Sequence, residues 1–346
     1  LLTKIDLAGN PVSSYGINGV ITINSFTQNE GISLIHIQKD GSILCVISPI
    51  TNFAPPQYEF AVRKFKSDGT VETTFGINGT LKITLNTPLN DYNFIETELD
   101  AFANNSILIS GYFINKVNLS WEACLIKINA NGKIDNNFGN NGKKIITRTG
   151  RQQDLTTIIL PTNEIVFACH EYPSSDEPGL LTEGVAVCKL SPTGEVITTF
   201  GQNGFISIEN AYPSHLMRLT QGFVACGGIK DGKGWLVKIS SSGTIESNFG
   251  QNGEVTIDYG VYNGISKSFP LKNDHLIVVG VVSLPSGQHE TFFARLNQSG
   301  IIDQTFANNG FYTTAYNFGD GYFGPDIIDI QNDGKILTIG GAGDST

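Results

Sequence analysis

The sequence has few charged residues and lacks the runs that mark nucleic-acid-binding or membrane-spanning proteins. Only 16% of its 346 residues are charged, the formal net charge is −10, and no cluster of Lys and Arg occurs. A phosphate backbone would therefore meet net repulsion. No apolar run approaches the roughly 18 residues that cross a bilayer. We expect a protein that binds no nucleic acid and does not insert into a membrane.

Paired cysteines are also missing. The five cysteines are widely spaced, form no C-x-x-C, and lie inside apolar strand-like runs such as "SILCVIS": Cys45, Cys124, Cys169, Cys188 and Cys226. This spacing indicates neither a zinc knuckle nor a disulfide framework. We expect five small buried side chains, and their redox state is not predicted.

The common catalytic strings are absent as well. "HEYPS" and "HETFF" begin like the zinc motif H-E-x-x-H but lack its second His, and no G-x-S-x-G occurs. Cys169, His170 and Glu171 resemble a thiol nucleophile with its base. Adjacent residues of a strand point to opposite faces, however, which argues against contact between Cys169 and His170. The sequence therefore assigns no catalytic residue.

What the sequence does contain is a repeat. The pattern aromatic-Gly-x-Asn-Gly occurs six times, with Ala in place of the first Gly once, and begins at positions 15, 75, 138, 200, 249 and 306. The spacings are 60, 63, 62, 49 and 57 residues. A phosphate-binding glycine loop is normally used once, so six copies favour a structural role. A long, nearly fixed period is typical of repeat architectures.

Each repeat predicts four short strands. In one unit these are "GISLIHIQ", "GSILCVIS", "FAVRKFK" and "TLKITL", separated by Gly, Asn and Asp turns, and no helical periodicity competes. Such units build either a linear solenoid or a radial propeller. The first segment supplies only third and fourth strands, and the last only first and second strands. A solenoid needs capped ends, whereas a ring joins them.

We therefore predict an all-β fold, a six-bladed β-propeller of four-stranded blades, as a single domain over residues 1–346. Its closing blade would be shared between residues 1–24 and 324–346, because these segments supply complementary strand pairs. Pairing the termini would also protect strand edges that otherwise stay open.

The order of the motifs resembles a known family. "IQNDGKIL" at 330–337, the basic strand and "DG" turn at 63–69, and "FGING" at 75–79 are similar to the bacterial delta-60 repeat. The resemblance covers essentially the whole chain and implies a β-propeller. It implies no catalytic residues, because the family has no established activity. It suggests a bacterial protein that is secreted or at the cell surface.

Positions that recur in all six copies indicate scaffold. The Asn-Gly pair predicts a turn with positive φ. The first Gly, replaced by Ala307 in one copy, suggests a need for smallness rather than for a special dihedral. The motif aromatic should wedge between neighbouring blades. A basic residue precedes each motif, and we expect structural ion pairs or extended side chains rather than an anion channel: Lys4, Lys64, Lys127, Lys189, Lys238 and Arg295.

Function is expected where the copies differ. Long, irregular connections follow the second strands and precede the first strands, and in a propeller both sets emerge on one face. Their aromatic, amide and carboxyl side chains suit a sugar or a protein loop. The predicted binding residues are Tyr58, Tyr92, Asn93, Trp121, Tyr172, Tyr212, Tyr262, Tyr316, Asp320 and Tyr322. The alternative is that these aromatics only pack against the blades.

Carboxylates near the predicted axis provide a second candidate site. Glu30, Asp154 and Asp326 precede or begin first strands, with Asn263 and Arg151 nearby. Converging carboxylates could perform acid–base work or hold a divalent cation such as calcium. "GDGYFGPD" lacks the D-x-D-x-D-G calcium spacing, so no metal site is assigned and no cofactor is expected otherwise.

Three functional hypotheses follow. The first is a non-enzymatic scaffold, more in keeping with the repeats than an enzyme, that presents a protein- or carbohydrate-binding face and acts as a monomer. The second is a hydrolase or lyase that uses the axis carboxylates. The third is a structural module within a longer protein.

Overall fold

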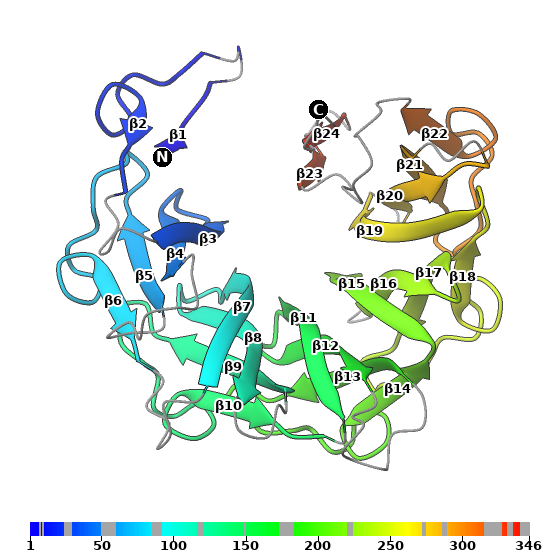
Figure 1. Cartoon of the computed structure of the whole chain (residues 1–346), viewed down its shortest axis with the longest axis horizontal. Coiled ribbons are helices and arrows are strands. Elements are labelled where there is room, and N and C mark those ends of the chain that lie inside the picture. The colour runs from blue at the N-terminus through cyan, green and yellow to red at the C-terminus, as the bar shows by residue number, and fades with distance from the viewer. Residues whose placement is uncertain are drawn as a thin grey trace. The chain divides into compact units, whose positions relative to one another are not determined.

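The computed structural model is all-β over the residues that it describes. These are 1–6, 8, 10–23, 30–49, 60–84, 92–115, 121–148, 150–172, 183–219, 224–271, 275–285, 289–314, 327–330 and 335–339. The chain divides into two compact units. Figure 1 labels the strands of both. Unit 1 comprises Leu1–Arg148, Pro161–Asn163 and Pro192–Glu195, and unit 2 comprises Thr149–Leu160, Glu164–Ser191 and Val196–Thr346. No helix in the described part is long and apolar enough to cross a membrane.

Unit 1 contains one two-stranded and two four-stranded antiparallel sheets, each in sequence order. The two-stranded sheet pairs β1 (Leu2–Thr3) with β2 (Val20–Ile21). The next comprises β3 (Glu30–Ile37), β4 (Ile43–Pro49), β5 (Phe60–Phe65) and β6 (Thr80–Ile83). The third comprises β7 (Tyr92–Ala101), β8 (Ile107–Asn115), β9 (Trp121–Ile128) and β10 (Lys143–Ile146).

Unit 2 contains three four-stranded sheets and one two-stranded sheet. The first comprises β11 (Arg151–Ile159), β12 (Ile165–Tyr172), β13 (Gly184–Leu190) and β14 (Phe205–Glu209). The second comprises β15 (Ala211–Arg218), β16 (Val224–Lys230), β17 (Lys233–Ile239) and β18 (Glu254–Ile257). The third comprises β19 (Tyr262–Pro270), β20 (Leu276–Ser283), β21 (His289–Leu296) and β22 (Phe311–Thr314). The last pairs β23 (Ile327–Ile330) with β24 (Ile336–Ile339).

The hydrophobic core lies between neighbouring sheets. The middle strands are buried on both faces: all seven residues of β13 are buried, whereas the outer strand β14 alternates between buried and exposed positions. In unit 2 one apolar cluster joins Val166 and Val187 to Trp235 and Val237 of the next sheet. Burial of apolar side chains between neighbouring sheets is the main stabilising contribution to this arrangement. The five cysteines are free and buried, as expected.

The Asn-Gly turns are confirmed, but the prediction for the first Gly of each motif is wrong. All six motif Asn residues have φ between 51° and 54°. The first Gly is also left-handed in its five copies, and Ala307 adopts φ 45°. A Cβ at Gly76 would lie 2.3 Å from the Thr80 carbonyl oxygen. The position therefore requires both a positive φ and the absence of a side chain, and Ala307 is strained.

Five of the six motif aromatics are buried as wedges, as predicted, and Phe306 is only half-buried. Phe249 is 2% exposed, and a Cβ built on Gly300 of the neighbouring sheet would lie 3.0 Å from its ring. The preceding basic residue extends over the ring, with Lys238 Nζ 5.9 Å from the Phe249 centroid. Ion pairs hold other members of this series, including Lys189 with Glu164 at 2.9 Å and Arg295 with Asp303 at 2.8 Å. These contacts are structural, as the sequence indicated.

A backbone hydrogen bond joins neighbouring sheets at the same place within each unit. The amide of the first motif Gly donates to a carbonyl in the turn that precedes the next motif. In unit 1, Gly76 N lies 2.8 Å from Asn131 O, and in unit 2, Gly201 N lies 2.9 Å from Ser242 O and Gly250 N 2.7 Å from Ser299 O. A side chain at the first Gly would block this approach.

The first strand of every four-stranded sheet contains a β-bulge, which the sequence did not reveal. The register shifts between Ile32 and Leu34 in β3, and the four other first strands shift at corresponding places. In two strands a hydroxyl at the bulge donates to a carbonyl of the second strand: Ser33 to Val46 and Thr97 to Ser110. In a third, the Ser214 hydroxyl oxygen lies 3.1 Å from the Gly227 carbonyl oxygen. At each bulge the side chains of the first strand no longer alternate regularly between the two faces of the sheet.

Candidate functional site

The side chains of eight of the thirteen predicted site residues lie outside the described part of the chain. Tyr58, Tyr316, Asp320, Tyr322 and Asp326 lie outside the described residues. Tyr92 and Asn93 begin β7 and Tyr262 begins β19, but their side chains are not described.

In unit 1, Trp121 begins β9 and stacks on Tyr112, with ring centroids 5.5 Å apart. Glu30 begins β3 in the same unit, whereas Asp154 lies in unit 2. Convergence of Glu30, Asp154 and Asp326 therefore stays a prediction.

The structure does bring two predicted aromatics together in unit 2. Tyr172 ends β12 and Tyr212 lies near the start of β15, and the His170 ring is packed between them. The His170 centroid lies 3.9 Å from that of Tyr172 and 4.1 Å from that of Tyr212. His170 is fully buried. Among the described residues, neither of its ring nitrogens has a hydrogen-bond partner.

Asp154 joins this cluster through an amide. Gln153 pairs in register with His170, and its Nε2 donates both to Asp154 Oδ2 at 2.9 Å and to the Tyr172 hydroxyl at 2.8 Å. Asp154 occupies the bulge of β11 with φ 52° and is exposed. The bulge therefore presents a carboxylate beside Tyr172, with one oxygen fixed by Gln153.

A second carboxylate acts on the same group. Burial lowers the pKa of His170, while the negative charges of Asp154 and Glu183 oppose that shift. Burial raises the pKa of Tyr172, and the same two carboxylates raise it further. Glu183 directly precedes β13. At neutral pH the site therefore combines a neutral imidazole and a neutral phenol with two acidic side chains. We define these six residues as the His170 cluster: Gln153, Asp154, His170, Tyr172, Glu183 and Tyr212.

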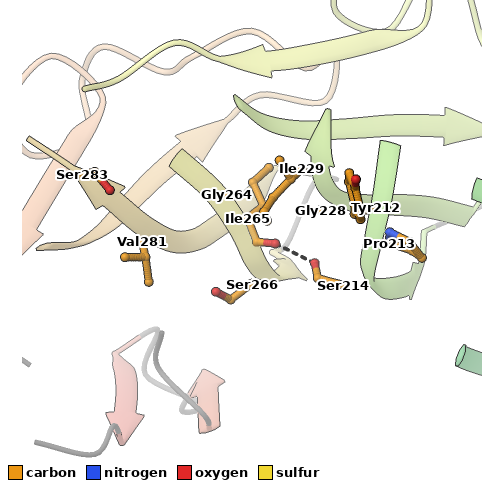
Figure 2. Close-up of a pocket in the computed structure, with 10 residues that line it drawn as sticks. All are labelled: Tyr212, Pro213, Ser214, Gly228, Ile229, Gly264, Ile265, Ser266, Val281 and Ser283. Carbon is orange, nitrogen blue, oxygen red and sulfur yellow. Dashed lines mark hydrogen bonds between the residues drawn. The ribbon is translucent and has the colours of Figure 1, made fainter. Parts of the chain in front are cut away.

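A pocket of about 340 Å³ lies beside the cluster and shares Tyr212 with it (Figure 2). It is built from the starts of β15 and β19 and the ends of β16 and β20, which are the strand ends that the sequence assigned to the variable face. Its lining comprises Tyr212, Pro213, Ser214, Gly228, Ile229, Gly264, Ile265, Ser266, Val281 and Ser283. This volume is typical of sites for small ligands.

A buried network fixes the wall of the pocket. Ser214 Oγ donates to the Ile265 carbonyl oxygen at 2.6 Å, shown dashed in Figure 2, and lies 2.9 Å from His215 Nδ1. Ser268 pairs with His215 Nε2. Burial lowers the pKa of His215 to about 3, with Lys267 adding to the shift. The imidazole is therefore neutral, and it ties β15 to β19 rather than activating Ser214.

The described part of the chain contains no group of three His, Cys, Asp or Glu side chains that could hold a metal ion. The sequence interpretation missed Gln153, His170 as a non-thiol site residue, Glu183, Ser214 and His215. The available signal was position. His170 and Glu183 flank a long variable connection, and Ser214 precedes a His near the start of a first strand. Their mutual contacts depend on bulges and on packing between sheets, which no local pattern records.

Comparison with known proteins supports the fold. Residues 103–138 match the family model described as a domain of unknown function (DUF5122) beta-propeller. No curated protein matches the sequence. The chain is thus an all-β protein built from the four-stranded antiparallel sheets of a β-propeller. The match does not establish the delta-60 repeat.

Solved structures with a similar fold include enzymes. The NanB sialidase of Streptococcus pneumoniae has a TM-score of 0.53 and 9% identity, covering 97% of this chain and 68% of the sialidase. The Trypanosoma rangeli sialidase in complex with sialic acid has a TM-score of 0.46 and 11% identity, covering 98% of this chain and 54% of the other. CoXyl43, a GH43 β-xylosidase/α-arabinofuranosidase from a compost microbial metagenome, has a TM-score of 0.38 and 9% identity, covering 90% and 94%.

The NanB sialidase contradicts the first functional hypothesis. A non-enzymatic scaffold was inferred from the purely structural character of the repeats, yet an enzyme shares this type of fold. The repeats define how the sheets are built and do not separate binding modules from enzymes. The expectation that the protein is not an enzyme therefore loses its support.

Proposed function

We propose that the protein is a carbohydrate-cleaving hydrolase whose site is the His170 cluster with its adjoining pocket. The observation that carries the proposal is the placement of two acidic side chains near the buried His170 and the half-buried Tyr172. Asp154, at the bulge of β11, is linked to Tyr172 through Gln153, and Glu183 directly precedes β13. Titratable groups gathered beside a pocket are typical of catalytic sites.

Two carboxylates supply the chemistry that glycoside hydrolysis needs. One protonates the oxygen of the leaving sugar, and the other activates water or attacks the sugar carbon. We assign the second role to Asp154, because Gln153 orients its carboxylate while leaving Oδ1 available. Glu183 is then the proton donor.

The remaining groups suit a sugar. The Tyr172 hydroxyl accepts a hydrogen bond from Gln153, so its own proton is available to a ligand oxygen. The Tyr212 ring offers an apolar surface at the pocket wall, against which sugar C–H groups pack. The likeness to NanB sialidase supports the proposal only in showing that this fold accommodates an enzyme acting on carbohydrate.

Activity measurements on a panel of 4-nitrophenyl glycosides and oligosaccharides test the proposal. We expect the wild-type protein to cleave at least one, and Asp154→Asn and Glu183→Gln each to lower kcat by about 10²- to 10⁴-fold without a change in circular dichroism. Glu246→Gln, near the motif turn after β17, is the matched control and should leave kcat unchanged. Absence of cleavage across the panel, or full activity in both site variants, would refute the assignment.

We also propose that the two two-stranded sheets complete one shared blade, giving six blades, and that the motif copies are delta-60 repeats. The support is the sequence pattern, in which residues 1–24 carry third- and fourth-strand signatures and residues 324–346 first- and second-strand signatures. Deletion of residues 326–346 should then lower the melting temperature and promote aggregation, because the shared blade loses two strands. A cooperative melt at the wild-type temperature would contradict closure.

A further inference from the structure

We propose that the site takes a neutral sugar in preference to an anionic one, and that Tyr212 is the movable wall between the pocket and His170, whose ring nitrogens bind ligand hydroxyls. The inference rests on the proposed function and assigns the substrate class and the binding residues.

The charges around the cluster favour a neutral ligand. The charged groups that act on His170 and on Tyr172 are the acidic side chains Asp154 and Glu183. In the proposed reaction Asp154 is the carboxylate, and Glu183 holds the proton that it donates. Arg151 begins β11, where it pairs in register with Tyr172. Farther along unit 2, Lys230 is held by Glu254 at 2.7 Å. A sugar carboxylate beside Asp154 would meet repulsion from that carboxylate on top of its own desolvation.

His170 has the hydrogen-bonding character that a sugar hydroxyl requires. A neutral imidazole carries one donor nitrogen and one acceptor nitrogen, and a hydroxyl can both accept and donate. A carboxylate can only accept, so it matches half of this ring. Because both nitrogens of His170 are buried without a partner among the described residues, pairing them with a ligand hydroxyl removes an unfavourable burial of polar atoms.

Tyr212 controls access to those nitrogens. Its ring contacts the His170 ring on one side, and the same residue lines the 340 Å³ pocket. His170 is 0% exposed, so a ligand in the pocket reaches it only after the Tyr212 ring turns aside. Tyr212 is half-buried and sits near the start of β15, where the bulge after Pro213 interrupts regular pairing. We therefore expect ligand binding to couple to rotation of this side chain.

The test compares neutral with anionic probes on the intact chain. Cleavage would be measured with 4-nitrophenyl glycosides of glucose, galactose, xylose and arabinose, and with those of glucuronic acid and N-acetylneuraminic acid. Binding of the corresponding methyl glycosides would be measured by titration calorimetry. We expect kcat/KM for the best neutral probe to exceed that of either anionic probe at least 100-fold.

Two variants examine the residue assignments. His170→Phe keeps a flat ring between the two tyrosines but removes both nitrogens, and should raise KM for the best neutral probe at least tenfold while kcat changes less. Tyr212→Ala removes the wall and should accelerate binding of the same probe in stopped-flow tyrosine fluorescence. His275→Asn, outside the cluster, is the control for histidine replacement and should leave both quantities unchanged.

The outcomes separate the two levels of the proposal. If no probe is bound or cleaved, the proposed function itself is wrong. If cleavage depends on Asp154 and Glu183 but anionic probes are preferred, or if His170→Phe leaves KM unchanged, the hydrolase assignment survives and the inference on substrate class and binding residues is overturned.

Discussion

The Ser214 hydroxyl lies 2.9 Å from Nδ1 of His215, and with Ser268 on Nε2 both nitrogens of this fully buried imidazole are paired. The network reaches from β15 to the Ile265 carbonyl oxygen of β19. It resembles a serine–histidine dyad in distance alone, because Ser214 is bonded to a carbonyl and the imidazole stays neutral. The pair is therefore a structural brace under the pocket, in contrast to His170.

The buried His215 predicts a loss of stability in acid. Its pKa is about 3 in the folded protein and 6.5 as its ordinary value, so only the unfolded chain gains a proton between these limits. The contribution is complete above pH 6.5 and declines toward pH 3, by up to about 1.4 kcal/mol per pH unit. Urea unfolding of wild type and His215→Asn at pH 7 and pH 4.5 should show the smaller pH dependence in the variant. An equal change in the free energy of unfolding between pH 7 and pH 4.5 in both proteins would contradict the prediction. His275→Asn provides the control.

Strain at Ala307 predicts that a reverse substitution stabilises the protein. Ala307 adopts φ 45°, a conformation that disfavours a Cβ by about 1–2 kcal/mol. Ala307→Gly should therefore raise the free energy of unfolding by up to about 1 kcal/mol, since greater freedom of glycine in the unfolded chain offsets part of the relief. Chemical denaturation measures the change, and an unaltered or lower midpoint would argue against strain.

The matching change in the opposite direction is Gly201→Ala. Its φ is 56°, and a Cβ there would lie 2.3 Å from the Phe205 carbonyl oxygen. The substitution should lower the free energy of unfolding by more than 1 kcal/mol, because strain and a backbone clash act together. An unchanged free energy of unfolding would mean that this position does not need a residue without a side chain.

The different burial of the motif aromatics predicts that their replacement by Ala lowers the free energy of unfolding by different amounts. Phe249 is 2% exposed and is wedged against Gly300, so Phe249→Ala should destabilise by about 3–5 kcal/mol. Phe306, the equivalent residue of the last copy, is only half-buried. Phe306→Ala should lower stability clearly less in the same urea titration. Similar losses for both variants would refute the difference in wedging.

The sequence predicts the parts of the structure that local chemistry determines. Asn252-Gly253 needs a positive φ wherever it occurs, and the apolar run around Cys188 can only be an inner strand, so turns and strands were readable. Asp154 was noted for its place before a first strand, but its link to Tyr172 through Gln153 depends on a bulge. The contact of His170 with Tyr212 joins two sheets. Such contacts depend on three-dimensional packing and leave no periodic trace.

The hydrogen bond from Gly201 N to Ser242 O uses main-chain atoms only. A hydrogen bond between peptide groups does not depend on the identity of most neighbouring side chains, so each duplicated repeat would keep this contact with the next sheet. The loops and strand surfaces could then change in sequence after duplication without loss of the contact. The His170 cluster, built on the sheet of β11 to β14, is the kind of specialisation that such a connection permits.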